Sequence, residues 1–169
     1  MMKRKAGILL PVSSLPSHYG IGCFDEAAYK FVDWLQSAGQ HYWQILPLVP
    51  TSYGDSPYQS FSTFAGNPYF ISLDKLVEAG FLTAQDIKAV DMGKNPFDID
   101  YAKLYNGRYK LLRKAYEKSR ISENQDFQQY VADNGWWLED YALFMALKDR
   151  FEGKCWNEWP EDIRLRWGY

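Results

Sequence analysis

The segment Ile8-Leu-Leu-Pro-Val12 is a short continuous apolar run, and Trp43-Gln-Ile-Leu-Pro-Leu-Val49 is a second one. Runs of this kind are typical of strands buried on both faces of a parallel sheet. Between them, Asp25 can cap a helix whose apolar residues recur at helical spacing to Leu35, and Gly39 stands where a helix often stops. The order strand, helix, strand predicts a βαβ unit with parallel strands and a right-handed crossover, as in the interior of a barrel.

The second half of the chain changes character, because no strand-like alternation follows Leu73. Helix signals predict one helix capped by Asp74 and ended by Gly80, one opened by the capping box Thr83-Ala-Gln-Asp86, one from Asp100 to about Ser119, one over Glu123–Asn134 and one over Trp136–Arg150. Apolar residues go almost all round the last of these helices, so we expect it to be buried.

Between these halves lies an aromatic loop, Tyr53-Gly-Asp-Ser-Pro-Tyr-Gln-Ser-Phe-Ser-Thr-Phe-Ala-Gly-Asn-Pro-Tyr69. Its prolines fix φ and its glycines permit tight turns, so neither a regular helix nor a regular strand suits it. Hydroxyl and amide groups stand beside flat rings, which is the combination that sugars need, since their hydroxyls require directional partners and their C–H faces pack on aromatic rings. Such loops also serve as packed connectors, and composition alone leaves both interpretations open.

The exact string resembles a signature of the 4-α-glucanotransferases, which are the amylomaltases and disproportionating enzymes of the α-amylase-like clan. The resemblance rests on Tyr53-Gly-Asp-Ser-Pro-Tyr-Gln-Ser60 followed by Phe64-Ala-Gly-Asn-Pro-Tyr69. Upstream, Gly7-Ile-Leu-Leu-Pro-Val-Ser-Ser-Leu-Pro16 and Tyr42-Trp-Gln-Ile-Leu-Pro-Leu48 look like the first two barrel strands of the family. Downstream, Trp136-Trp-Leu-Glu-Asp-Tyr-Ala-Leu-Phe-Met-Ala-Leu-Lys148 looks like one of its helices.

This resemblance implies an α/β fold: the start of a TIM-type (β/α)8 barrel with a mostly helical inserted subdomain. Residues 1–52 would form the first βαβ unit of the barrel, residues 53–72 an aromatic substrate loop and residues 73–169 the helical subdomain. In a TIM-type barrel the active site lies at the carboxyl ends of the strands. Both the Ser13–Phe24 loop and the aromatic loop follow strands, so we expect both at that rim.

The implied activity is 4-α-glucanotransfer, in which a segment of an α-1,4-glucan passes to another glucan or to glucose by a retaining double displacement. Such chemistry needs two carboxylates about 5–5.5 Å apart. Asp25-Glu26 belongs to a helix start, Glu139-Asp140 to a helix interior, and Asp55 stands alone in its loop. In the clan these acids follow later strands, so by resemblance the chain is an N-terminal portion that carries no catalytic residue and is inactive alone.

Two other functions stay open at this point. The chain could be a non-catalytic glucan-binding or structural fragment, and the whole protein could be a hydrolase of the same clan. The expected partners are α-1,4-glucans and maltooligosaccharides, as in starch or glycogen metabolism. The sequence gives no prediction of oligomeric state.

Five residues are candidates for substrate contact by similarity to the family. Tyr58 would lie beside the cleavage subsites, and Asp55 and Ser56 would border the donor site. Tyr53 matches a tyrosine of a secondary glucan-binding groove, and Tyr105 matches its partner there. Two tyrosines on different elements can stack on a curved amylose chain.

Tyr105 has a second interpretation, because it lies on one helical stripe together with Tyr109, Leu112 and Tyr116. An apolar stripe of this kind is typical of a helix face packed on a core. The sequence leaves open whether Tyr105 binds glucan or belongs to the core.

Composition excludes several classes of partner. The 19 basic and 21 acidic residues give a net charge of -2, which offers no basic excess for nucleic acid. No segment approaches the roughly 20 apolar residues of a membrane span. The apolar stretch after Met1-Met-Lys-Arg-Lys5 is too short for a signal peptide and is interrupted by Pro11, so we expect a cytoplasmic protein.

Metal and cofactor sites are not expected either. His18 and His41 are not at ligand spacing, although His18 could contact a sugar from the first strand–helix loop. There is no phosphate-binding loop or nucleotide fingerprint. Cys23 and Cys155 lie far apart without a CxxC pattern; they could form a bridge, but free thiols in a reducing cytoplasm are the expectation.

Overall fold

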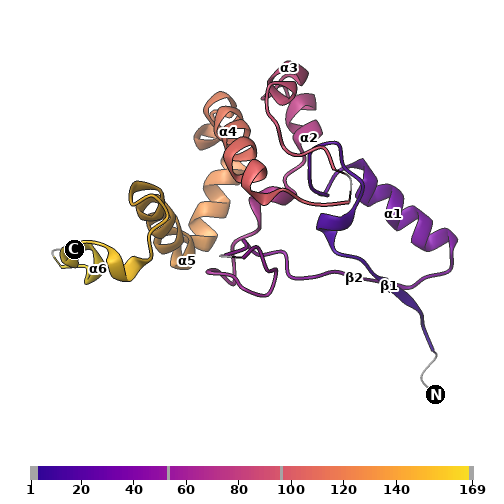
Figure 1. Ribbon diagram of the computed structural model, residues 1–169, viewed down its shortest axis with the longest axis horizontal. Helices are drawn as coiled ribbons and strands as arrows, with labels where there is room; N and C mark the ends of the chain where they lie inside the picture. Colours follow the sequence, from indigo (N-terminus) through magenta and orange to yellow (C-terminus); the bar gives the residue numbers. More distant parts are fainter. Residues whose placement is uncertain (1–3, 53, 96, 168–169) are drawn as a thin grey trace. The chain divides into compact units, whose positions relative to one another are not determined.

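The computed structural model describes residues 4–52, 54–95 and 97–167, which group into two units, Met1–Ile121 and Ser122–Tyr169. The first unit contains β1 (Gly7–Leu9), the 3-10 turn η1 (Val12–Ser14), α1 (Glu26–Ser37), β2 (Tyr42–Gln44), the 3-10 turn η2 (Pro68–Phe70), α2 (Leu73–Glu78), α3 (Ala84–Lys88) and α4 (Tyr101–Ser119) (Figure 1). A 3-10 turn, η3 (Ile121–Glu123), falls at the division. The second unit contains α5 (Gln125–Arg150), the 3-10 turn η4 (Trp156–Glu158) and α6 (Glu161–Arg164).

The predicted βαβ unit is confirmed, because β1 and β2 pair in parallel with α1 between them in sequence. The ladder joins Gly7 to Tyr42, Ile8 to Trp43 and Leu9 to Gln44. Both strands are shorter than expected. Pro11 and Pro47 have no N–H to donate, which limits how far a ladder can continue past each strand.

The expected burial of both strands is wrong for the described residues. In each strand only the middle residue is half-buried, and the side chain of Leu9 is 56% exposed. The reason is that a strand is buried only where neighbours cover its edges and faces, and the described sheet has just these two strands.

Most predicted helix caps are confirmed. The Asp25 carboxylate accepts a hydrogen bond from the Ala27 N–H at 2.9 Å, Thr83 and Asp86 form the capping box of α3, and Asp100 caps an α4 that ends at Ser119 as expected. The Asp74 cap is wrong. Ser72 caps α2 instead, because it is the extended residue before the first turn and its hydroxyl accepts from the Lys75 N–H at 3.2 Å.

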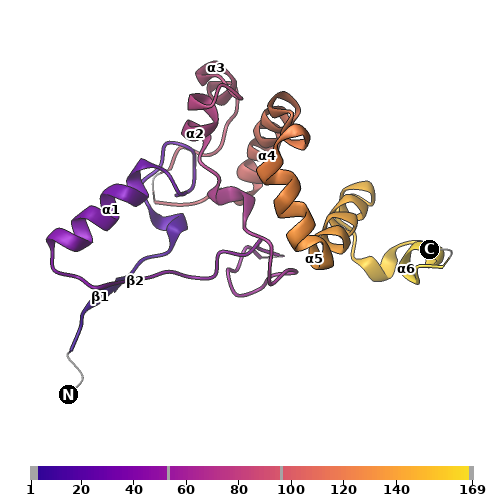
Figure 2. The same ribbon diagram turned by 180° about the vertical axis from the view of Figure 1, so that it is seen from behind.

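The core of the first unit gathers α2, α3 and α4. Its buried members are Ile21, Tyr69, Leu73, Leu82, Ile87, Met92, Leu104, Leu111 and Ala115. In both ribbon views α2 and α3 lie between α1 and α4 (Figures 1 and 2). A smaller cluster consists of Val12 and Leu15 from the loop that follows β1 and of Ala28 from α1. Residues from both sides of the aromatic loop therefore share one unit.

In the second unit, one continuous helix replaces the two that were expected over Glu123–Asn134 and Trp136–Arg150. The expected burial is also wrong: α5 has no buried residue, and Trp136 is 71% exposed. An all-round apolar helix needs neighbours on every side. Trp159 packs near the end of α5, where its ring centroid lies 5.7 Å from that of Phe144 and 5.5 Å from that of Phe151.

Two further observations bear on the sequence predictions. Cys23 is a buried free thiol and Cys155 an exposed one. Among the described residues, no helix combines the length and the apolar character needed to cross a membrane.

Candidate functional site

The aromatic loop is irregular, as expected, and short backbone contacts fasten it. The Ser52 N–H donates to the Gln59 carbonyl at 2.9 Å, and the Asn67 N–H donates to the Leu48 carbonyl at 2.8 Å. Asn67 in turn accepts from the Tyr69 N–H at 2.9 Å and so caps η2. The loop therefore leaves the second strand and enters the helical section at defined points.

Asp55 and Ser56 lie at a sharp bend of this loop, and both are half-buried. Gly54 has φ +85° and Asp55 has φ +55°, a left-handed conformation in which Asp is enriched among non-glycine residues. Burial raises the pKa of the Asp55 carboxyl. The Ser56 hydroxyl accepts from the Tyr58 N–H at 3.3 Å, which holds the backbone beside Tyr58.

Tyr58 projects from the loop with 74% of its side chain exposed. A large amphipathic ring in this state offers both a stacking face and a hydroxyl to a ligand. Tyr53, the other tyrosine predicted from this loop, lies outside the described residues.

Tyr105 is on α4 and is 58% exposed. The buried face of α4 is formed by Leu104, Gly107, Arg108, Leu111 and Ala115. Leu112, on the same stripe as Tyr105, is partly buried against the core, whereas Tyr105 itself is mostly exposed. The side chain of Tyr105 therefore lies at the surface, where the first interpretation, contact with glucan, needs it to be.

A cluster of tyrosines joins α4 to the end of the aromatic loop. The buried Tyr69 ring lies 6.1 Å from Tyr101 and 5.7 Å from Tyr109, and Tyr109 lies 5.3 Å from Tyr105. Burial first, and then the neighbouring Tyr109 and Asp55, raise the pKa of Tyr69. Burial and Asp55 also raise the pKa of Tyr101. The structure thus brings Asp55 and the Tyr105 face of α4 to one region, although the two are far apart in sequence.

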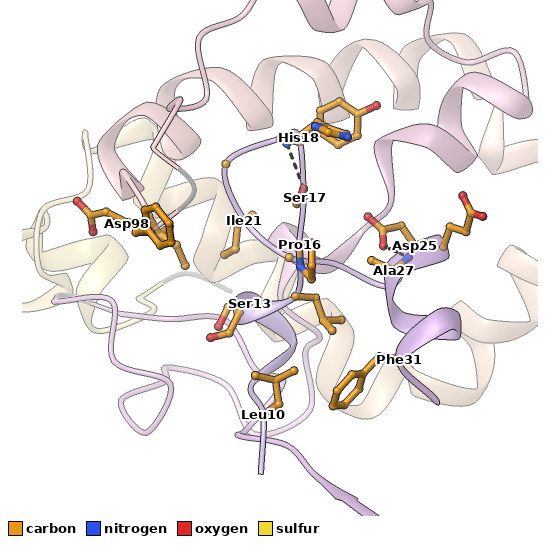
Figure 3. A pocket seen from close by; sticks show the side chains of 18 of the residues that line it. Leu10, Ser13, Pro16, Ser17, His18, Ile21, Asp25, Ala27, Phe31 and Asp98 are labelled. Atoms are coloured by element: carbon orange, nitrogen blue, oxygen red, sulfur yellow. Dashed lines mark hydrogen bonds between the residues drawn. The ribbon is translucent and has the colours of Figure 1, made fainter. Parts of the chain in front are cut away.

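A cavity of about 1260 Å³ follows the carboxyl end of β1 (Figure 3). It is lined by the first strand–helix loop, by the start of α1 and by Asp74. The remaining lining residues are Asn95, Phe97, Asp98, Ile99 and Tyr101. In the view, Leu10 and Phe31 lie at one end and His18 at the other (Figure 3). The Tyr19 hydroxyl donates to the Asp74 carboxylate beside it. Carboxylates, hydroxyls and an imidazole thus stand beside aromatic rings, a lining suited to a polar ligand with apolar faces.

Tyr101 lines this cavity and also contacts Tyr69, so the cavity adjoins the tyrosine cluster. Sequence reasoning missed Tyr69, Tyr101 and the segment around Asp98 as site residues. Tyr101 directly follows the predicted Asp100 cap, so its place at the start of a helix could have been predicted. Nothing in the sequence around Asp98 indicates that this segment lines a cavity. Within the described part of the chain, no group of three or more His, Cys, Asp or Glu side chains could hold a metal ion.

Comparison with known proteins gives consistent matches. A family model described as 4-alpha-glucanotransferase matches residues 10–167. The chain is 52% identical to the 4-alpha-glucanotransferase of Streptococcus pneumoniae and 45% identical to that of Thermus thermophilus, each over 98% of the chain and 33% of the relative. An amylomaltase from Streptococcus agalactiae in complex with acarbose matches with a TM-score of 0.87 and 40% identity, over 98% of this chain and 34% of that one. The chain thus spans about a third of the length of the curated relatives it matches.

Proposed function

Because the chain belongs to the 4-alpha-glucanotransferase family, we propose that a full-length protein carrying these residues moves segments of α-1,4-glucans between acceptors. The transfer would be a retaining double displacement in which another glucan or glucose, not water, accepts the held glycosyl segment. The observation that carries the proposal is the convergence of the aromatic loop and the tyrosine face of α4 in one unit. The solved relative that holds acarbose supports a carbohydrate ligand in this family.

Each predicted site residue has a role in this proposal. Tyr58 contacts a glucose unit at the cleavage subsites, where its exposed ring stacks on the C–H face and its hydroxyl donates or accepts. Asp55 and Ser56 border the donor site from the bend before it. Tyr105 and Tyr53 form the secondary groove that holds a longer glucan. Aromatic walls at these points favour a sugar acceptor over water.

The architecture is part of the same proposal. We take β1, α1 and β2 as the opening of a TIM-type (β/α)8 barrel, which the parallel pairing supports. Residues 1–52 then form the first βαβ unit, residues 53–72 the substrate loop and residues 73–169 the mostly helical subdomain. The cavity beside β1 and the aromatic loop would lie at the rim where barrel active sites gather.

Product analysis on maltotriose tests the function. A full-length protein carrying these residues should release glucose together with oligomers longer than maltotriose, and the newly formed linkages should keep the α configuration. A hydrolase of the same clan would give glucose and maltose without longer products, and that result would refute the transferase proposal.

The 169-residue chain alone is the matched comparison. It should show no turnover above a protein-free control, because the sequence supplies no convincing carboxylate pair for the two displacement steps. Retained glucan binding without turnover would be the behaviour of a glucan-binding portion of the enzyme. Turnover by the purified chain, with contaminating enzyme excluded, would contradict the assignment of the catalytic acids to other parts of the protein.

A further inference from the structure

Arg108 is a fully buried cation on α4, with 0% of its side chain exposed. Its Nη2 donates to the Ile71 carbonyl at 2.6 Å, while Nε and Nη1 have no hydrogen-bond partner among the described residues. Burying a guanidinium with so few acceptors is costly for the fold. A leucine or methionine would fill the same space without the free-energy cost of burying a charge. Packing alone therefore does not explain why an arginine stands at this position.

The surroundings of Arg108 come from two other parts of the unit. Burial lowers the pKa of the guanidinium, and the nearby Cys23 and Asp25 act in the opposite direction. Asp25 is 7% exposed and is the cap of α1, and the Cys23 Sγ donates to its carboxylate at 3.2 Å. Burial and the hydrogen bond to Asp25 raise the pKa of Cys23 to about 12, so at neutral pH the thiol keeps its proton and donates it to the Asp25 carboxylate.

Arg108 therefore connects three segments at one buried point. It belongs to α4, it contacts the carbonyl of Ile71, which follows the aromatic loop, and it lies near the cap of α1. On the outer side, Tyr105 stands three residues before Arg108 and Tyr109 one residue after it. Tyr69, two residues before Ile71, packs on Tyr109.

The neighbouring Gly107 shows how closely α4 is seated. A Cβ added at Gly107 would lie 2.4 Å from Cγ1 of Val90 and 3.3 Å from the Asp91 carbonyl oxygen, so a larger residue there would force Val90 or the helix to shift. Close packing at Gly107 and a directional hydrogen bond at Arg108 together restrict the rotation and the height of α4. A directional contact fixes rotation in a way that apolar packing alone does not.

On the basis of the proposed glucan groove, we propose that Arg108 is a positioning residue that sets α4 against the aromatic loop and so places Tyr105 for long glucans. It does not touch the substrate. It acts through the Ile71 carbonyl and the rotation of α4, and its loss should affect the groove more than the cleavage subsites at Tyr58.

The test compares Arg108→Met with Arg113→Met in a full-length protein that carries these residues. Arg113 is an exposed arginine on the same helix, so the control removes the same charge without the buried contact. Arg108→Met should raise KM for amylose roughly 10-fold and leave kcat/KM for maltotriose within about 2-fold, because only long chains reach the groove. Arg113→Met should match the wild type on both substrates.

A double-mutant cycle with Tyr105→Ala checks that Arg108 acts through the groove. If it does, adding Arg108→Met to Tyr105→Ala should raise KM for amylose no further. Additive effects, or equal losses on amylose and maltotriose, would overturn the positioning role. If the wild-type protein forms no oligomers longer than maltotriose, the proposed function fails. If Tyr105→Ala alone has no effect on amylose, the proposed groove fails. Both results differ from those that would overturn the positioning role of Arg108, so the failures are distinguishable.

Arg108→Lys covers the case in which Arg108→Met does not fold. Lysine keeps the charge but offers a single ammonium in place of the guanidinium fork. It should show the same amylose-selective loss in a smaller degree. An amylose KM equal to that of the wild type would contradict the proposal, and so would failure of both variants to fold, because the role would then be general stability.

Discussion

Tyr58 and Tyr69 stand in the same loop and have opposite surroundings. Tyr58 is 74% exposed, whereas Tyr69 is 5% exposed and packs against Tyr101 and Tyr109. The buried tyrosine holds the loop to α4, and the exposed one is available to a ligand. A single loop thus carries both the residue that positions it and the residue proposed to bind substrate.

Replacing Tyr58 should reduce turnover more than replacing Tyr53. In a full-length protein, Tyr58→Ala should lower kcat on maltotriose, since a contact at the cleavage subsites can strengthen in the transition state. Tyr53→Ala should raise KM chiefly for amylose, because it removes a contact that only long chains reach. Each loss should be about 1–3 kcal/mol, or roughly 5- to 150-fold, which is the size of a stacking contact removed by alanine substitution.

Steady-state kinetics of both variants on maltotriose and amylose measure this difference. Tyr116→Ala is a suitable control, because it removes a tyrosine that is 60% exposed on α4 and has no part in the proposed site. Equal losses for Tyr58→Ala and Tyr53→Ala on maltotriose would remove the distinction between a cleavage-site tyrosine and a remote-groove tyrosine.

At the scale of elements, the sequence predicts best what depends on neighbours along the chain. The caps at Asp25, Thr83 and Asp100 were predictable, since a cap needs one side chain and an N–H two or three residues later. Strand length and the burial of α5 were not, because both depend on neighbours from elsewhere. The site divides in the same way: the family resemblance of the loop string implied Tyr58, but the tyrosine cluster needs α4 and the loop in one fold.

Two glycines with the same backbone conformation should differ in what alanine costs. Gly20 has φ +78° and Gly80 has φ +76°, so either alanine would be strained by about 1–2 kcal/mol. At Gly80 nothing lies within 4 Å of an added Cβ, whereas at Gly20 the Met92 carbonyl oxygen would lie 1.9 Å away. Gly20→Ala should therefore lose about 1–3 kcal/mol more, as overpacked sites do. Urea unfolding of both variants in a full-length protein measures the gap, and equal losses would contradict the close contact between the first loop and Met92.

Acid should weaken the link between α3 and α4. The Lys114 ammonium, 2.6 Å from the Asp86 carboxylate, is the main cause that holds the pKa of Asp86 at about 2, and hydrogen bonds from Thr83 add to it. Since the folded pKa is depressed, the contribution to stability is present above the unfolded pKa of about 4 and is lost as pH falls toward 2. Thermal melts of the wild type and Asp86→Asn in a full-length protein should differ at pH 6 and converge near pH 2. A difference that stays constant over this range would show that the ion pair contributes nothing.

At the scale of the whole molecule, the described residues expose apolar side chains in two places. The two-stranded sheet exposes Leu9, and α5 exposes Trp136 and Leu143, although the sequence of its Trp136–Arg150 part is apolar almost all round. Both features belong to segments that resemble the barrel strands and a helix of the family. In each of these segments the apolar residues reach further than the burial within its own unit.

The 169-residue chain produced alone should consequently associate with itself. Exposed strand edges pair with other chains, and contiguous apolar patches bury themselves against whatever is available. Size-exclusion chromatography with light scattering, run over a range of concentrations, should show a mass that rises with concentration, and a hydrophobic dye should bind more than it does to a full-length protein. Replacing Trp136 and Leu143 with glutamine should lower the mass, because these side chains on α5 are 71% and 50% exposed and neither has a place in the proposed site. A monomer at all concentrations with a sharp cooperative melt would show that the helical section closes its own core, and the exposed face of α5 would then need another explanation.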